Sequence, residues 1–160
     1  MNAIKEIENY ILEHQHIDSP EVWEFELTPY LTNLINNLNQ TETNDFYNKV
    51  LEWEDEFSYL ITLSIFDSTN RFLDATSLYI KIFSKIKDIE YLEILIENDI
   101  PFIRPPYDTI NKIKDWDLVQ IEKLKQNILR VMEVKVGSWN ETLIEVVDYL
   151  EQLKANKASS

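Results

Sequence analysis

The chain has 160 residues, of which 44% are hydrophobic and 12% aromatic, so it can build a buried core and is not expected to be disordered. Its formal net charge of −14 opposes binding to nucleic acid or anionic lipid and favours basic protein partners. One glycine and no cysteine exclude disulfides, thiolate catalysis and glycine-rich phosphate-binding loops.

The first 38 residues predict two helices separated by a short break. Apolar residues at helical spacing place the first stripe at Ile4, Ile7 and Ile11. Ser19 and Pro20 are typical of an N-cap followed by proline at the first helical position. Pro29 should kink or restart the second helix. The expected buried stripe of this second helix is Trp23, Leu27, Leu31, Leu34 and Leu38.

Residues 36–44 are polar and predict a loop, with Thr43 as the cap of a third helix. Beyond it, apolar residues recur at alternating spacings of four and three. They are Phe46, Val50, Trp53, Phe57 and Leu60. This run is either one long helix to Phe66 or two helices broken near Glu54.

The second half predicts further helices around one proline-rich interruption. A helix is expected over residues 72–86, and Asp88 separates it from a shorter one. Three prolines in residues 100–107 exclude regular α-helix and predict an extended strap. Capping-box patterns at Asp117-x-x-Gln120 and Ser138-x-x-Glu141 mark the last two helices, with Gly137 between them.

These patterns predict an all-α fold of seven to eight helices in a single domain, residues 1–160, with a frayed tail from about residue 155. Residues 23–31 resemble residues 53–60 if Pro29 is an insertion, an offset near one helical hairpin. The arrangement is therefore either an irregular bundle or a short HEAT-like array of helical hairpins. No signal peptide or membrane-spanning stretch is recognisable, so we expect a cytoplasmic protein.

Catalytic and metal-binding motifs are sparse. Glu13 and His16 have the Glu-x-x-His spacing of di-iron bundles, but those bundles need it twice with two further glutamates, and the chain has no histidine outside the cluster of His14 and His16. We therefore predict no metal, no cofactor and no enzymatic activity. The alternative of a carboxylate-based enzyme stays open, because 29 acidic residues are present.

The acidic residues are concentrated near the N-terminus. Residues 1–60 carry 13 acidic side chains and two basic ones, a charge of −11, whereas residues 61–160 carry −3. Two strings there combine tryptophan with carboxylates, and an acidic rim around a half-exposed aromatic suits a basic protein. The predicted partner-binding residues are Trp23, Glu24, Glu26, Trp53, Glu54, Asp55 and Glu56.

In size, charge, helical pattern and these two acidic strings, the chain resembles the small acidic helical immunity proteins of bacterial polymorphic-toxin and contact-dependent growth inhibition systems. The resemblance implies a non-enzymatic cytoplasmic protein that neutralises a cognate toxin domain, often a basic nuclease, by covering its active site. The alternative is a helical adaptor or regulatory module that uses its acidic surface for another partner. Neither hypothesis predicts binding to nucleic acid or membrane, and the oligomeric state is left open.

Overall fold

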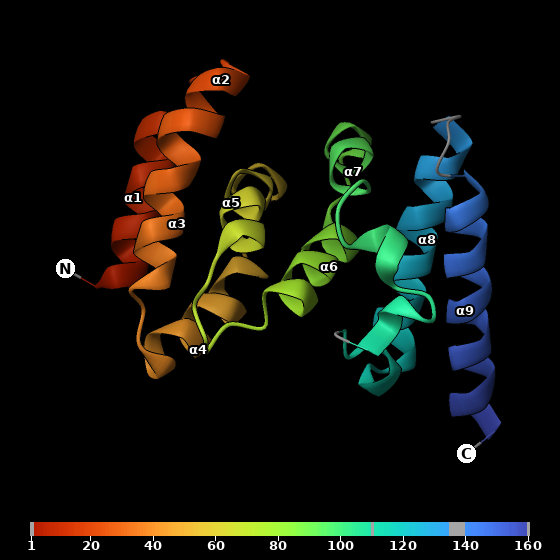
Figure 1. Ribbon diagram of the computed structural model, residues 1–160. Helices are drawn as coiled ribbons and strands as arrows, with labels where there is room; N and C mark the ends of the chain where they lie inside the picture. Colours follow the sequence, from red (N-terminus) through yellow and green to blue (C-terminus); the bar gives the residue numbers. More distant parts are fainter. Residues whose placement is uncertain (1, 110, 135–139, 160) are drawn as a thin grey trace. The chain divides into compact units, whose positions relative to one another are not determined.

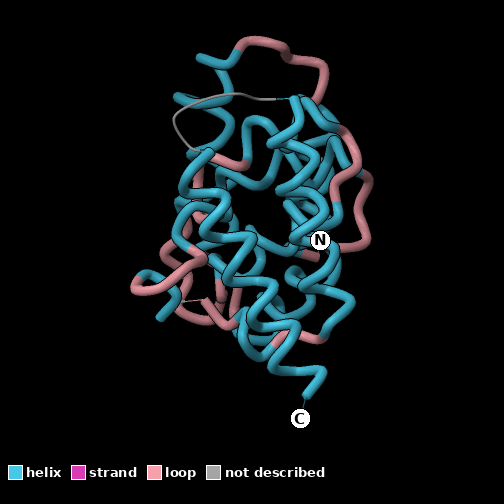
Figure 2. Tube along the Cα trace, turned by 90° about the vertical axis from the view of Figure 1, so that its right-hand side faces the viewer, coloured by secondary structure: helices cyan, strands magenta, loops and turns pink. Residues whose placement is uncertain are grey.

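The computed structural model describes residues 2–109, 111–134 and 140–159, which form helices and turns without a strand (Figures 1 and 2). The α-helices are α1 (Ala3–His14), α2 (Pro20–Val22), α3 (Thr28–Asn36), α4 (Gln40–Val50), α5 (Asp55–Asp67), α6 (Ala75–Lys85), α7 (Ile89–Leu95), α8 (Leu118–Val134) and α9 (Asn140–Ser159). A π-helical turn, η1 (Trp23–Leu27), joins α2 and α3, so the described residues form eight continuous helices. The all-α prediction is confirmed.

The chain divides into two compact units, residues 1–82 and residues 83–160, with the boundary inside α6. Each unit contains a helical hairpin of the expected kind. A single domain over residues 1–160 implies that the two units unfold together, and this stays a prediction. The choice between an irregular bundle and a HEAT-like array also stays a prediction.

In the first unit, α1 and α3 run antiparallel, and α3 packs against α5 (Figure 1). The Ser64 hydroxyl of α5 donates to the carbonyl oxygen of Thr28 at 3.1 Å, a direct polar link between α5 and α3. The core combines apolar side chains from α1, α3, α4 and α5. Its fully buried members include Ile7, Ile11, Leu31, Ile35, Phe46, Ile61 and Ile65.

In the second unit, α8 and α9 form an antiparallel hairpin, which α7 and the 3₁₀ turn η2 (Ile100–Phe102) contact. Ion pairs set its register: Lys125 lies 2.5 Å from Glu151, and Lys154 pairs with Glu122. Buried apolar residues fill the space between the helices. They include Leu92, Leu95, Ile121, Leu124, Ile128, Val146 and Leu150.

Local capping chemistry was predicted well at some boundaries and wrongly at one. Ser19 and Asp88 cap the helices that follow them, and the run after residue 40 is two helices with Glu54 just before α5. Thr43 is not a cap, which is a correction. Asn39 caps α4 in a capping box with Glu42, and Thr43 is buried one turn later.

The expected extended strap over residues 100–107 is wrong. The segment is indeed not α-helical, but it folds into short turns, η2 and then η3 (Tyr107–Thr109). Proline fixes φ near a value that 3₁₀ turns also use, and Pro101 lies at the start of η2, where a missing N–H leaves no bond unmade.

The C-terminal helix is longer than predicted. Helix α9 continues to Ser159, past the residue where fraying was expected. The Lys157 ammonium donates to the carbonyl oxygen of Lys114 at 2.6 Å, which fixes the last turns to the rest of the unit. The predicted signals at Gly137 and Ser138 lie outside the described residues.

Candidate protein-binding surface

The first acidic string lies on the π-helical turn η1, which Pro29 explains. Proline lacks an N–H and its ring clashes with the carbonyl four residues earlier in an α-helix. The turn widens instead, and the Thr28 N–H bonds to the carbonyl of Trp23, five residues back. From the end of this turn onward, Leu27, Leu31 and Leu38 are buried as predicted, but Ile35 is fully buried and the predicted Leu34 is only half-buried.

Within this turn, Trp23 is half-buried and hydrogen-bonded, whereas Phe25 is exposed to solvent. Trp23 is half-buried, and its indole Nε1 donates to the carbonyl oxygen of Ile17 at 2.7 Å. Phe25 is 71% exposed, the highest value among the large apolar side chains of the described residues. Glu24 and Glu26 on either side of it are exposed as predicted. The exposed aromatic of this string is therefore Phe25, which the predicted set of binding residues missed.

The second acidic string begins before α5. Trp53 is half-buried and packs edge-on against Phe57 at 5.9 Å between ring centroids. Glu54 and Glu56 are exposed, and Asp55 is half-buried. Because Asp55 and Glu56 occupy the first turn of α5, the helix dipole favours their negative charge. These carboxylates therefore have a local stabilising role besides any contact with a partner.

The two strings adopt different local structures despite their similar sequences. Trp23 lies inside a continuous helical run, whereas Trp53 lies in the turn that precedes α5. The one-residue insertion that aligns the strings coincides with the π-helical turn, since both add a single residue near Pro29. Each string is consequently positioned by its own neighbours.

An aromatic stack next to the first string was not predicted. The Tyr10 and Tyr30 rings stack at 4.3 Å between centroids, and His14 packs on Tyr10 at 4.1 Å. Burial, and then the neighbouring Tyr30 and Glu26, raise the pKa of Tyr10. The stack joins α1 to α3 beside η1, and it gives His14 a structural role at the end of α1. Its signal in the sequence is weak, because tyrosines 20 residues apart predict no contact.

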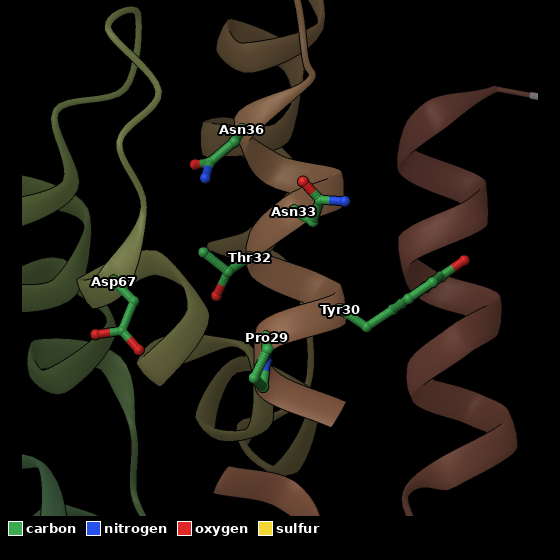
Figure 3. A pocket seen from close by; sticks show the side chains of 6 residues that line it. All are labelled: Pro29, Tyr30, Thr32, Asn33, Asn36 and Asp67. Atoms are coloured by element: carbon green, nitrogen blue, oxygen red, sulfur yellow. The ribbon is translucent and has the colours of Figure 1, made fainter. Parts of the chain in front are cut away.

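A shallow open depression of about 550 Å³ lies between α3 and the end of α5 (Figure 3). Its lining residues are Pro29, Tyr30, Thr32, Asn33, Asn36 and Asp67. Tyr30 points away from Asp67 toward α1, and Asn36 accepts hydrogen bonds from Ser68 and Thr69. Asp67 and Tyr30 are the titratable side chains of this lining, and because Tyr30 points away from Asp67 the two are not arranged as an acid–base pair.

Two further searches of the described residues bear on function. No group of three or more histidine, cysteine, aspartate or glutamate side chains is placed to hold a metal ion within residues 2–109, 111–134 and 140–159. Over the same ranges, every helix is too short or too polar to cross a bilayer. Glu13 and His16, whose spacing was weighed as a metal motif and rejected, lie near the end of α1, and both are exposed.

The charge asymmetry of the sequence follows the division into units. Residues 1–82 carry 15 acidic and four basic side chains, a charge of −11, and residues 83–160 carry 14 acidic and 11 basic ones, a charge of −3. Most of the carboxylates of the first unit are exposed. Most of the net negative charge of the protein therefore lies on the first unit.

A comparison of the chain with protein families, curated proteins and solved structures finds no match in any of the three. The functional argument therefore depends on the charge distribution, the exposed side chains and the way the helices hold them.

Proposed function

We propose that this protein is an immunity-type inhibitor that binds a cognate basic toxin domain of nuclease type and covers its active site. The observation that carries the proposal is the charge of −11 on residues 1–82, which is not matched in residues 83–160. Clustered like charge works against a compact state, so its presence suggests a compensating use. The proposal includes no catalytic step, metal or cofactor, and it places the protein in the cytoplasm.

The mechanism is electrostatic and steric. A nuclease needs a basic cleft for the phosphates of its substrate, and an acidic protein surface competes for that cleft. Charge steers the encounter, and apolar contacts at the centre of the interface hold the complex. Stable protein interfaces bury on the order of 1,600 Å² in total, enough to exclude RNA or DNA from such a cleft.

The described side chains support this mechanism at both acidic strings. Glu24 and Glu26 are exposed beside Phe25, and Glu54 and Glu56 are exposed beside the half-buried Trp53. Exposed carboxylates keep their charge in water and reach a partner without loss of internal packing. We therefore retain the two strings as the proposed interface.

The test begins with affinity capture of the tagged chain from its native host, followed by purification of the captured partner. We expect a basic partner whose nuclease activity falls to background when the two proteins are equimolar. A neutral or acidic partner would contradict the proposal. So would a partner whose nuclease activity persists when the complex is saturated.

A further inference from the structure

Phe25 has no ready explanation in the packing of the first unit. It is 71% exposed, whereas the next most exposed large apolar side chain of this unit, Leu12, is 51% exposed. Burial of an aromatic side chain removes about 150–250 Å² of surface from water, so the exposed Phe25 could still gain favourable hydrophobic free energy by burial. The side chain is therefore suited to burial against another molecule.

The backbone that carries Phe25 is held from several sides. The π-helical turn fixes it between α2 and α3, the Trp23 indole is tied to the Ile17 carbonyl at 2.7 Å, and Ser64 bonds to the Thr28 carbonyl at 3.1 Å. π-Helical turns occur frequently at functional sites. A side chain on a fixed backbone loses little further freedom on binding, which favours affinity.

Carboxylates flank Phe25 in the sequence. Glu21, Glu24 and Glu26 are exposed, and Glu21 lies four residues before Phe25, close to a full helical turn away. We infer that Phe25 is the apolar anchor of the interface and inserts into an apolar pocket bordered by lysine or arginine on a basic protein. This inference rests on the proposed function and adds the chemistry of the pocket that the partner must present.

Two synthetic helical peptides with equal numbers of lysines test the anchor, one carrying leucines on its second face and one carrying serines there. Each peptide is titrated at low salt into the intact chain and followed by amide NMR shifts and calorimetry. We expect the leucine peptide to shift resonances around residues 21–28. Phe25→Ala should weaken its binding about tenfold, because a central anchor contributes that order of affinity. The serine peptide should bind the variant and the parent chain equally.

Val119 supplies the matched control, since it is 65% exposed in the second unit. Val119→Ala should leave the binding of both peptides unchanged, and circular dichroism should show that both variants keep the helical fold. If Phe25→Ala weakens binding of the leucine peptide no more than Val119→Ala does, the inference that Phe25 is the anchor is contradicted. Reversal of Glu24 and Glu26 to lysine then separates the two ideas. If both peptides bind that variant more weakly, the acidic interface is supported even though the anchor is wrong. If their binding is unchanged, both the acidic interface and the anchor are contradicted.

Discussion

The two units of this protein use charge in opposite ways. In the second unit, carboxylates pair with cations between helices: Lys125 of α8 lies 2.5 Å from Glu151 of α9, and Lys154 of α9 pairs with Glu122 of α8. In the first unit, polar side chains link the helices through hydroxyl and amide groups, while most carboxylates face outward. Part of the charge of the second unit is thus balanced within its own fold, whereas most carboxylates of the first unit are exposed, as the proposed partner surface requires.

In their interiors the two units share one feature: each has a buried asparagine that donates hydrogen bonds to carbonyl oxygens at the end of a helix. Asn70 donates from Nδ2 to the carbonyl oxygens of Ile35 and Leu38 at the end of α3. Asn127 donates to those of Phe83, Ser84 and Ile86 at the end of α6. Helix C-termini leave carbonyls without intrahelical partners, so both amides fill the same need. The units therefore differ in their surface more than in how their interiors are held.

The largest expected effect comes from these two asparagines. Asn70→Ala and Asn127→Ala should each lower the free energy of unfolding by about 2–3 kcal/mol, because buried carbonyls lose their donor. Urea unfolding at neutral pH measures the loss, with the exposed Asn33→Ala as control. If residues 1–160 form one domain, both variants shift the same single transition. Two separate transitions would contradict the single-domain prediction.

Asp99 differs from the ion-paired carboxylates of the second unit, because burial and not a neighbouring cation determines its pKa. Burial raises the pKa of Asp99 to about 6, above its ordinary value of 3.8. The folded state therefore binds the proton more tightly, so this group's stabilising contribution is present at low pH and is lost as pH rises from about 4 to about 6. NMR titration of the carboxyl measures its pKa. Asp99→Asn should remove this part of the pH dependence, and a carboxyl titrating near 4 would contradict the prediction.

Glu122 should change the pH dependence of the free energy of unfolding in the opposite direction from Asp99, and by a smaller amount. Hydrogen bonds, first from Lys154 and then from Gln126, lower the pKa of Glu122 to about 2. Its stabilising contribution is present above about pH 4.5 and is lost as pH falls toward 2. Because the group is largely exposed, we expect less than about 1 kcal/mol, reduced further by salt. Glu122→Gln should flatten unfolding stability between pH 5 and 2, with exposed Glu133→Gln as the control. Equal curves for the two variants would show that the pairing is not stabilising.

The sequence predicted features that depend on near neighbours. Ser19 is confirmed as a cap and Asp88 as the boundary between two helices. Of the two alternatives for the run after residue 44, the structure shows the one broken near Glu54. The π-helical turn was missed, because a 3.6-residue period assumes unbroken α-helix and the extra residue before Pro29 shifts the phase. Leu34 was expected in the core in place of Ile35 because the two residues follow the buried Leu31 by three and four positions, and the helical period alone does not choose between them.

The candidate surface was predicted only in part, because only some of its features depend on near neighbours in the sequence. Exposure of Glu24, Glu26, Glu54 and Glu56 follows from their charge alone. Phe25 was not singled out, because the tryptophan of each string was taken as the aromatic at its centre, and an exposed phenylalanine leaves no periodic signal. Contacts distant in sequence, such as Asn70 with α3, leave no periodic signal and could not be predicted.

The most direct test of the central claim compares charge reversal in the two units, measured as association rate with the captured partner. Glu24, Glu54 and Glu56 are changed to lysine in one variant, and Glu133, Glu141 and Asp148, which are also exposed, in the other. Thermal melting confirms folding, because lysine at the start of α5 opposes the helix dipole. We expect the first variant to associate at least about tenfold more slowly at low salt, with a weaker salt dependence, and the second to associate almost normally. Equal rates for two folded variants would contradict a partner surface on residues 1–82.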